Sequence, residues 1–184
     1  MRHWIVYILP HSHHDRGYTD IQPHIVEKQM KNIDLALDQI NQTKDYHPDA
    51  RFIWNAEVLW SVDDYLTFHP EKEPLLIAAI KDGTLYPNGW YANELTGLCR
   101  PEELLRLSTF GLKLEDKTGV PIDSAMISDV PGLTWGCIQA LNEAGIHYLS
   151  DGPNYFDRIG HTLVDTEDKP FYWLSPPGNN KVLV

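Results

Sequence analysis

The stretch that decides the fold lies near the N-terminus and reads Trp4-Ile5-Val6-Tyr7-Ile8-Leu9-Pro10-His11-Ser12-His13-His14-Asp15-Arg16-Gly17-Tyr18. Its first six residues form a continuous apolar run, which is typical of a strand buried on both faces, and a proline ends that run. Imidazole and carboxylate groups follow at once. Because active sites of parallel α/β sheets and barrels form at the carboxyl ends of strands, we expect a buried strand over residues 4–9 with a functional loop behind it.

The rest of the chain alternates short β-rich runs with longer helical ones, and this order predicts an α/β fold with a parallel sheet built from β-α units. The expected helices cover residues 22–43, 58–68, 74–81, 101–117 and 133–143. The expected further strands cover residues 51–54, 85–86, 124–127, 146–149, 171–174 and 181–184. Residues 1–184 contain no repeat or linker, so we expect one domain, and residues 151–169 form its longest irregular stretch.

The amino-acid composition disfavours several classes of protein. The chain has 15 Lys and Arg against 26 Asp and Glu, a net charge of −11, which disfavours binding to nucleic acid. No apolar stretch reaches the roughly 20 residues that span a bilayer, so we expect no membrane partner. The N-terminus lacks the pattern of a signal peptide, and Cys99 and Cys137 are too few for a disulfide framework. A cytoplasmic location is therefore expected, while the sequence leaves oligomerisation undetermined.

The first loop predicts a metal site. In an extended segment, His11, His13 and Asp15 point to one side, because side chains alternate with period two. Imidazole nitrogen together with carboxylate oxygen suits zinc, and also iron, cobalt or manganese. The alternative is that these histidines are structural residues held by hydrogen bonds. Asp129 follows another predicted strand, where it either caps a turn or holds a carboxylate near Asp15.

The segment from Gly89 to Glu94 joins aromatic rings to an amide and a carboxylate, and this mixture is typical of sugar binding. The alternative is a Trp90 in the core and an Asn93 that caps a turn. Tyr18 is either an aromatic wall of the site or a packed side chain. Glu57 either supports the metal site or is an acid at a helix N-terminus, and we favour the helix role.

In order, these motifs resemble the N-terminal catalytic domain of glycoside hydrolase family 38, the α-mannosidases. Family members carry His-x-His-x-Asp-x-Gly-aromatic after the first strand, as in residues 11–18 here. They carry a Gly-Trp segment and then a helix start of the type Pro/Ser-Glu-x-Leu-hydrophobic-Arg, as in residues 89–94 and 101–106. They also carry an Asp-x-x-Gly turn and a helix that leads to Ala-Gly, as in residues 129–132 and 144–145. The order matches over most of the chain.

The resemblance implies a seven-stranded β/α barrel, incomplete in this chain, and one Zn2+ ion. It implies that His13, Asp15 and Asp129 are zinc ligands and that Asp129 is the catalytic nucleophile of a retaining α-mannosidase-like glycoside hydrolase. We expect the carbohydrate substrate to meet four side chains, those of Tyr18, Trp90, Asn93 and Glu94. His11 is expected to orient the loop.

Some features depart from the family pattern and bear on sugar specificity. Arg16 stands where Pro is common, Tyr18 where Trp is common, and residues 131–134 replace Phe-Gly-x-Ser. The family's fourth zinc ligand and its general acid are expected beyond Val184. Two alternatives stay open: another metal-dependent hydrolase of the deacetylase, amidohydrolase or phosphoesterase type, and a truncated carbohydrate-binding homologue without activity.

Overall fold

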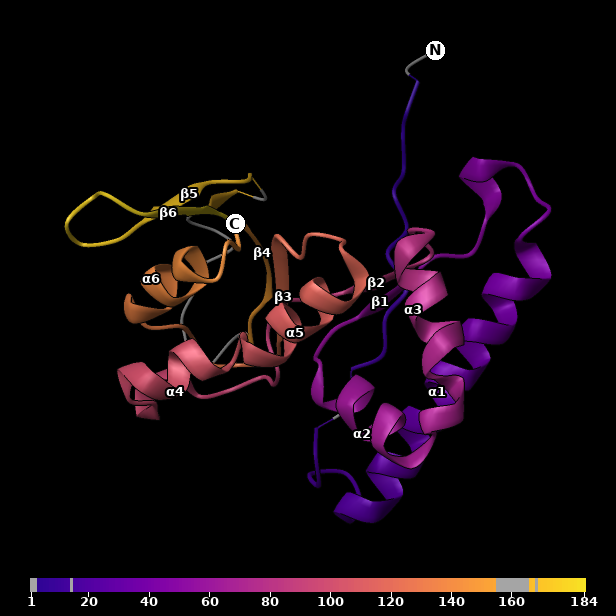
Figure 1. Ribbon diagram of the computed structural model, residues 1–184. Coiled ribbons are helices and arrows are strands. Elements are labelled where there is room, and N and C mark those ends of the chain that lie inside the picture. Colours follow the sequence, from indigo (N-terminus) through magenta and orange to yellow (C-terminus); the bar gives the residue numbers. More distant parts are fainter. Residues whose placement is uncertain (1–2, 14, 155–165, 168) are drawn as a thin grey trace.

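The computed structural model describes residues 3–13, 15–154, 166–167 and 169–184, in which helices alternate with short strands (Figure 1). Most of the expected irregular stretch 151–169 therefore lies outside the described residues. The α-helices are α1 (Gln22–Thr43), α2 (Trp60–Phe68), α3 (Glu73–Lys81), α4 (Pro101–Arg106), α5 (Thr109–Thr118) and α6 (Gly136–Glu143). Three short 3-10 helices are η1 (Pro48–Ala50), η2 (Pro70–Lys72) and η3 (Thr96–Leu98). No helix of the described part is long and apolar enough to cross a membrane.

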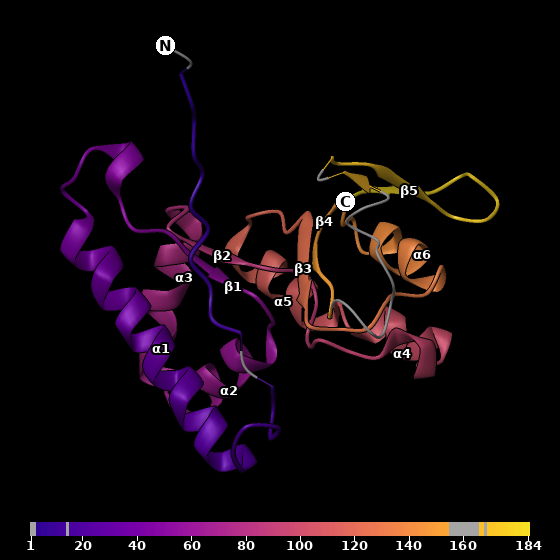
Figure 2. The ribbon, with the colours of Figure 1, turned by 180° about the vertical axis from the view of Figure 1, so that it is seen from behind.

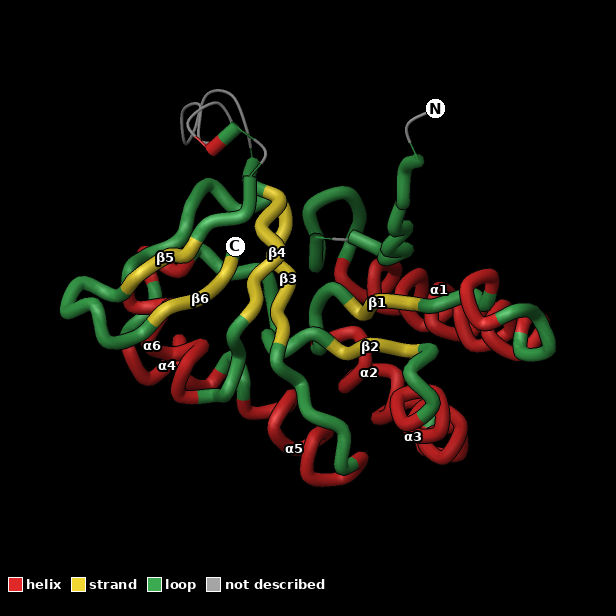
Figure 3. Tube along the Cα trace, turned by 90° about the horizontal axis from the view of Figure 1, so that it is seen from above, coloured by secondary structure: helices red, strands yellow, loops and turns green. Residues whose placement is uncertain are grey.

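The strands form two separate sheets, as Figure 3 shows from above. The first sheet pairs β1 (Trp54–Ala56) with β2 (Leu85–Pro87) in parallel. The second has the order β3-β4-β6-β5 and comprises β3 (Ser124–Ser128), β4 (Tyr148–Gly152), β5 (Tyr172–Leu174) and β6 (Lys181–Leu183). In it, β3, β4 and β6 run parallel, whereas β5 is antiparallel to β6.

The expected seven-stranded barrel is not seen, because the described residues contain six strands in two sheets. Between β2 and β3, no ladder of strand pairs forms. The backbone N–H of Gly89 donates to the carbonyl of Ser124 at 2.8 Å, and the next link is made by a side chain, that of Asn93. The predicted α/β class with parallel strands is confirmed, while the closed arrangement is not.

The prediction of a buried strand over residues 4–9 is wrong for this structure. These residues are extended, but their side chains are 56–81% exposed. Only the end of the segment meets a strand: His11 forms a parallel bridge with Asn55, whose N–H donates to the carbonyl of Pro10 at 2.9 Å. An apolar strand is buried by neighbours on both of its faces, and the described residues supply none along residues 4–9.

The predicted helix 101–117 is divided into α4 and α5. The break lies at Leu107, whose carbonyl accepts a hydrogen bond from the N–H of Tyr91 at 2.8 Å. That carbonyl is thereby tied to the loop behind β2, and the chain turns before α5 begins. The division lets α4 lie beside α6 while α5 contacts α3 (Figures 1 and 2).

Two main hydrophobic clusters support the sheets. One packs α1, α2, α3 and α5 around the β1–β2 pair and includes Leu59, Tyr65 and Leu76. The other packs α4 and α6 against β3, β4 and β6 and includes Trp90, Ile127 and Leu141. The clusters place the ends of β1, β2 and β3 on a rigid base.

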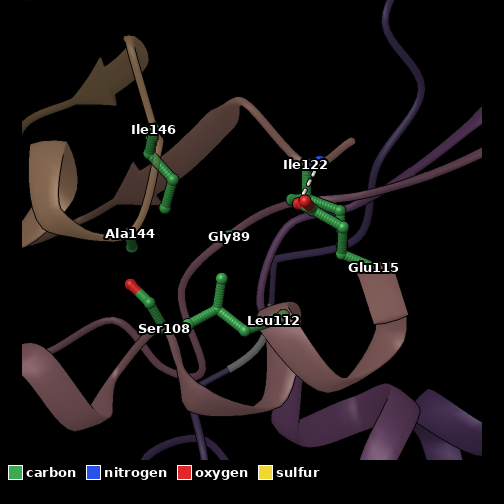
Figure 4. A pocket seen from close by; sticks show the side chains of 8 residues that line it. Gly89, Ser108, Leu112, Glu115, Ile122, Ala144 and Ile146 are labelled. Atoms are coloured by element: carbon green, nitrogen blue, oxygen red, sulfur yellow. Dashed lines mark hydrogen bonds between the residues drawn. The ribbon is translucent and has the colours of Figure 1, made fainter. Parts of the chain in front are cut away.

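Helix α5 packs closely on the chain that leaves β2. Figure 4 shows Gly89 between Ile146 on one side and Ser108 and Leu112 on the other. A Cβ at Gly89 would lie 2.2 Å from Cδ1 of Ile146, and a Cβ at Gly111 would lie 3.1 Å from the carbonyl of Gly89. Glycine at position 111 therefore allows α5 to approach the loop, and glycine at position 89 allows Ile146 to approach the loop from the other side.

Candidate metal centre and pocket

Four segments converge at the carboxyl ends of the first strands. They are the loop that contains His11 and His13, the residues directly after β1, the loop after β2, and the turn after β3. This convergence is the one expected from the rule for parallel sheets. The side chains that meet there are His11, His13, Asp15, Glu57, Asn93 and Asp129.

Glu57 is the buried centre of this arrangement. Its side chain is 1% exposed and accepts hydrogen bonds from Nδ1 of His11 and Nδ1 of His13, both at 2.6 Å. Asn93 Nδ2 donates to it at 2.8 Å. A buried carboxylate requires such donors, because burial without them costs several kcal/mol. The favoured expectation that Glu57 is a helix N-terminal acid is therefore wrong, since α2 begins at Trp60 and this carboxylate holds the two imidazoles.

His13 presents its second ring nitrogen to two carboxylates. Because Nδ1 carries the proton donated to Glu57, Nε2 keeps its lone pair. Nε2 is buried and has no hydrogen-bond partner among the described residues. It lies 4.0 Å from Oδ1 of Asp15 and 3.9 Å from Oδ2 of Asp129. A buried nitrogen lone pair without a partner indicates a ligand that the protein itself does not supply.

The three donor groups form a candidate site for a zinc ion. One atom each from His13, Asp15 and Asp129 lies within 4.8 Å of the others. Zinc bonds to nitrogen and oxygen are about 2.0–2.2 Å long, so two ligands of a tetrahedral ion lie roughly 3.3–3.6 Å apart. The two distances from His13, 4.0 and 3.9 Å, are slightly longer, so the side chains would draw together to bind one ion. The sequence predicts that His11 shares one side with His13 and Asp15, but His11 is not in this group, although its Nδ1 also binds Glu57.

Asp129 adopts an uncommon backbone conformation. Its φ is 59°, in the left-handed region that few residues other than glycine enter. Its N–H donates to the carbonyl of Gly152 at 2.7 Å, and Asn154 Nδ2 donates to its Oδ1. These contacts connect the turn after β3 to the end of β4. They hold the half-exposed carboxylate of Asp129 toward His13.

The loop behind β2 contributes differently from what the sequence predicted. Trp90 is 0% exposed and belongs to the core cluster, so in this structure its ring has no surface for a sugar. Asn93 lines the pocket described below, but its amide is occupied: it donates to Glu57 and accepts from the N–H of Ser128 at 3.1 Å. Glu94 lies on the pocket wall.

A pocket of about 420 Å³ opens beside Asp15. Its lining residues are Asp15, Arg16, Tyr18, Trp60, Tyr91, Ala92, Asn93 and Glu94. Tyr18 is 86% exposed and forms part of the wall. Trp60 and Tyr91 also line the pocket and were not singled out from the sequence. In the sequence, Trp60 lies within a predicted helix and so does not indicate a binding role. Tyr91 directly follows the Gly89-Trp90 pair and could have been identified from that position.

Two acidic groups on α2 contact residues that line the pocket. Burial raises the pKa of Tyr91 to about 12, and the hydrogen bond from its hydroxyl to Asp63, at 2.9 Å, adds to the rise. Burial also raises the pKa of Asp64, against the opposing charge of Arg16.

A separate carboxyl on β4 is also perturbed. The protein around Asp151 desolvates its carboxyl and raises the pKa to about 6, although the residue keeps exposed surface.

Comparisons with known proteins define the family. The sequence profile described as "Glycosyl hydrolases family 38 N-terminal domain" matches residues 3–184. The chain therefore belongs to glycosyl hydrolase family 38, as the resemblance indicated.

Individual proteins resemble the chain in sequence or in fold. A protein of Halalkalibacterium halodurans named "Putative mannosylglycerate hydrolase" is 25% identical over 186 residues, covering 96% of this chain and 20% of that protein. The crystal structure of an alpha-mannosidase from Enterococcus faecalis V583 has a TM-score of 0.75 at 21% identity, covering 95% of this chain and 19% of the other. A 4-alpha-glucanotransferase from Thermococcus litoralis has a TM-score of 0.65 at 15% identity, covering 95% of this chain and 26% of the other. At these identities the structures show the fold alone, and the chain spans about a fifth to a quarter of the relatives' length.

Proposed function

We propose that this chain carries the nucleophile and three zinc ligands of a retaining glycoside hydrolase that acts on terminal α-linked mannose. The observation that carries the proposal is the unpartnered, buried Nε2 of His13 facing the carboxylates of Asp15 and Asp129. Family membership and the adjacent pocket with aromatic walls support it. The names of the mannosylglycerate hydrolase and the alpha-mannosidase support mannose as the sugar.

The residues of the metal centre have separate tasks in this proposal. His13, Asp15 and Asp129 would hold Zn2+, which would neutralise the repulsion between two carboxylates and would polarise sugar hydroxyls. Glu57 fixes the tautomer and the orientation of His13, since a carboxylate can only accept from Nδ1–H. His11 shares that carboxylate and keeps the loop in place.

Asp129 performs the covalent step. Its carboxylate attacks the anomeric carbon as the bond to the leaving oxygen breaks, giving a glycosyl ester. The leaving oxygen takes a proton from a general acid, a role for which we assign no residue of this chain. Water then displaces the carboxylate and gives its proton to that same group, so two inversions give net retention. The half-exposed position of Asp129 beside His13 gives a sugar access to the attacking oxygen.

The alternative metal-dependent hydrolases use further histidine ligands behind later strands. The residues behind β2, β3 and β4 in the described part are 88–94, 129–132 and 153–154, and none is a histidine. This composition favours the glycosidase.

Inactivation by a fluorinated α-mannosyl reagent tests the nucleophile in the complete protein. We expect peptide mass spectrometry to place the label on Asp129 and NMR to show a product that retains the anomeric configuration. A label on another residue, or an inverted product, would refute this mechanism.

Elemental analysis tests the metal separately. Asp15→Asn and His13→Ala should each lose stoichiometric zinc, whereas Asp116→Asn on the far part of α5 should retain it. Equal zinc in all three variants would remove the metal centre from the proposal.

A further inference from the structure

The residue next to Asp15 is an arginine whose position is fixed before any ligand binds. Arg16 lines the pocket and its side chain is 41% exposed. Its guanidinium carbon lies 4.9 Å from the ring centroid of Trp60, and its Nη2 lies 3.0 Å from Oδ2 of Asp64. Both anchors belong to α2, and Trp60 is itself buried. A stacked and paired arginine loses little further freedom when it binds, so it is preorganised.

The ion pair leaves the guanidinium able to bind a ligand. Oδ2 of Asp64 has no hydrogen-bond partner in good geometry, so charge rather than a directed N–H···O bond holds it to Arg16. A guanidinium carries five N–H donors. These donors remain available to oxygen acceptors of a ligand in the pocket.

The charges nearby disfavour an anionic ligand. Asp64 balances the charge of Arg16, and Glu94 adds a negative charge to the same pocket. A carboxylate or phosphate on the ligand would meet a wall with no excess of positive charge from these side chains. Sugar hydroxyls, by contrast, accept hydrogen bonds from a guanidinium without bringing a charge with them.

We infer that Arg16 is a specificity-determining residue that donates hydrogen bonds to hydroxyl groups of an uncharged glycan bound beside Asp15. This inference rests on the proposed function and names the class of substrate for the same site. Asp64 and Trp60 are positioning residues, because they act through Arg16.

Steady-state kinetics of Arg16→Met in the complete protein test the inference. With a neutral aryl α-mannoside we expect KM to rise roughly 10- to 100-fold, the effect of losing a hydrogen bond from a charged donor, and kcat to change less than about threefold. Arg16→Lys should restore part of the affinity. Arg106→Met is the matched control, because Arg106 forms an exposed ion pair with Glu102 on α4, away from the pocket lining. A KM of Arg16→Met within about twofold of wild type would overturn the inference.

A pair of α-mannosides that differ only in a carboxylate and its primary amide tests the preference for an uncharged ligand. We expect wild type to use the amide at least as well as the carboxylate. A preference of about tenfold or more for the carboxylate, lost in Arg16→Met, would overturn the inference and make Arg16 an anion receptor.

Calorimetry separates this inference from the proposed function. Free mannose, which has no glycosidic bond to hydrolyse, is titrated into wild type and into Arg16→Met, after thermal melting has shown that both proteins are folded. Weaker binding to Arg16→Met supports the inference even if wild type hydrolyses no α-mannoside, in which case the proposed function alone fails. Equal binding, or no binding to either protein, overturns the inference.

Discussion

Replacing Glu57 by Gln changes one oxygen into an NH2 group at the centre of the candidate metal site. The carboxylate accepts from Nδ1 of both His11 and His13 at 2.6 Å, one bond at each oxygen. A glutamine keeps only one accepting oxygen. One imidazole must then face an N–H donor and either lose its hydrogen bond or move its proton to Nε2.

The expected loss of zinc affinity follows from this competition of two imidazoles for one accepting oxygen. If His13 moves its proton to Nε2, the lone pair that faces Asp15 and Asp129 is lost. If His11 loses its hydrogen bond instead, His13 donates to a neutral amide oxygen in place of a carboxylate, and the basicity of its Nε2 falls. Removing such a supporting partner typically lowers metal affinity about 10- to 100-fold, which is roughly 1.4–2.8 kcal/mol.

Competition with a fluorescent chelator measures this change in the complete protein. Glu102→Gln is the control, because it makes the same chemical change at an exposed ion pair with Arg106. Glu57→Gln with zinc affinity within about twofold of wild type would refute the reasoning, since the buried carboxylate would then have no part in holding the ligand. Circular dichroism of both variants confirms that the comparison is between folded proteins.

Two further predictions concern packing and pH. Gly89→Ala places a Cβ 2.2 Å from Cδ1 of Ile146, so urea unfolding should show a loss of about 1–3 kcal/mol, whereas Gly97→Ala, with its nearest neighbour at 3.7 Å, should change little. An unchanged stability of Gly89→Ala would mean that Ile146 does not pack on Gly89 as described. The pKa of Tyr91 is raised from about 10 in the unfolded chain to about 12, so its contribution to stability is complete below about pH 10 and is lost as the pH rises through about 12. Tyr91→Phe should flatten the fall in stability over that range in thermal melts, and identical slopes would contradict the assignment.

Local signals allowed much of the fold to be predicted. Helix α3 was predicted over residues 74–81 and spans Glu73–Lys81, because a proline in the first turn and a glycine behind the helix mark its ends. The apolar run before Asp129 predicted β3 within one residue. Polar groups behind parallel strands converge, and this rule correctly indicates that His13, Asp15 and Asp129 lie close together.

Features that depend on distant partners were not predictable. Glu57 stands next to Val58 and Leu59, so its neighbours in sequence indicate a helix start, whereas its hydrogen-bond partners are 44 and 46 residues away. Trp90 sits in a loop with turn residues, and only the packing of β3, α4 and α6 shows that it is core. The apolar run at residues 4–9 is typical of a buried strand, but a sequence pattern does not identify the chain segments that would cover it.

The left-handed backbone of Asp129 has a consequence for variation at this position. A left-handed conformation costs an ordinary side chain about 1–2 kcal/mol, and only Gly, Asn and Asp enter it readily. Of these, Asp alone carries a carboxylate, so backbone and chemistry together leave one residue that satisfies both. The same restriction has a practical use: Asp129→Asn suits the turn, so it should give a well-folded protein in which only the carboxylate is lost.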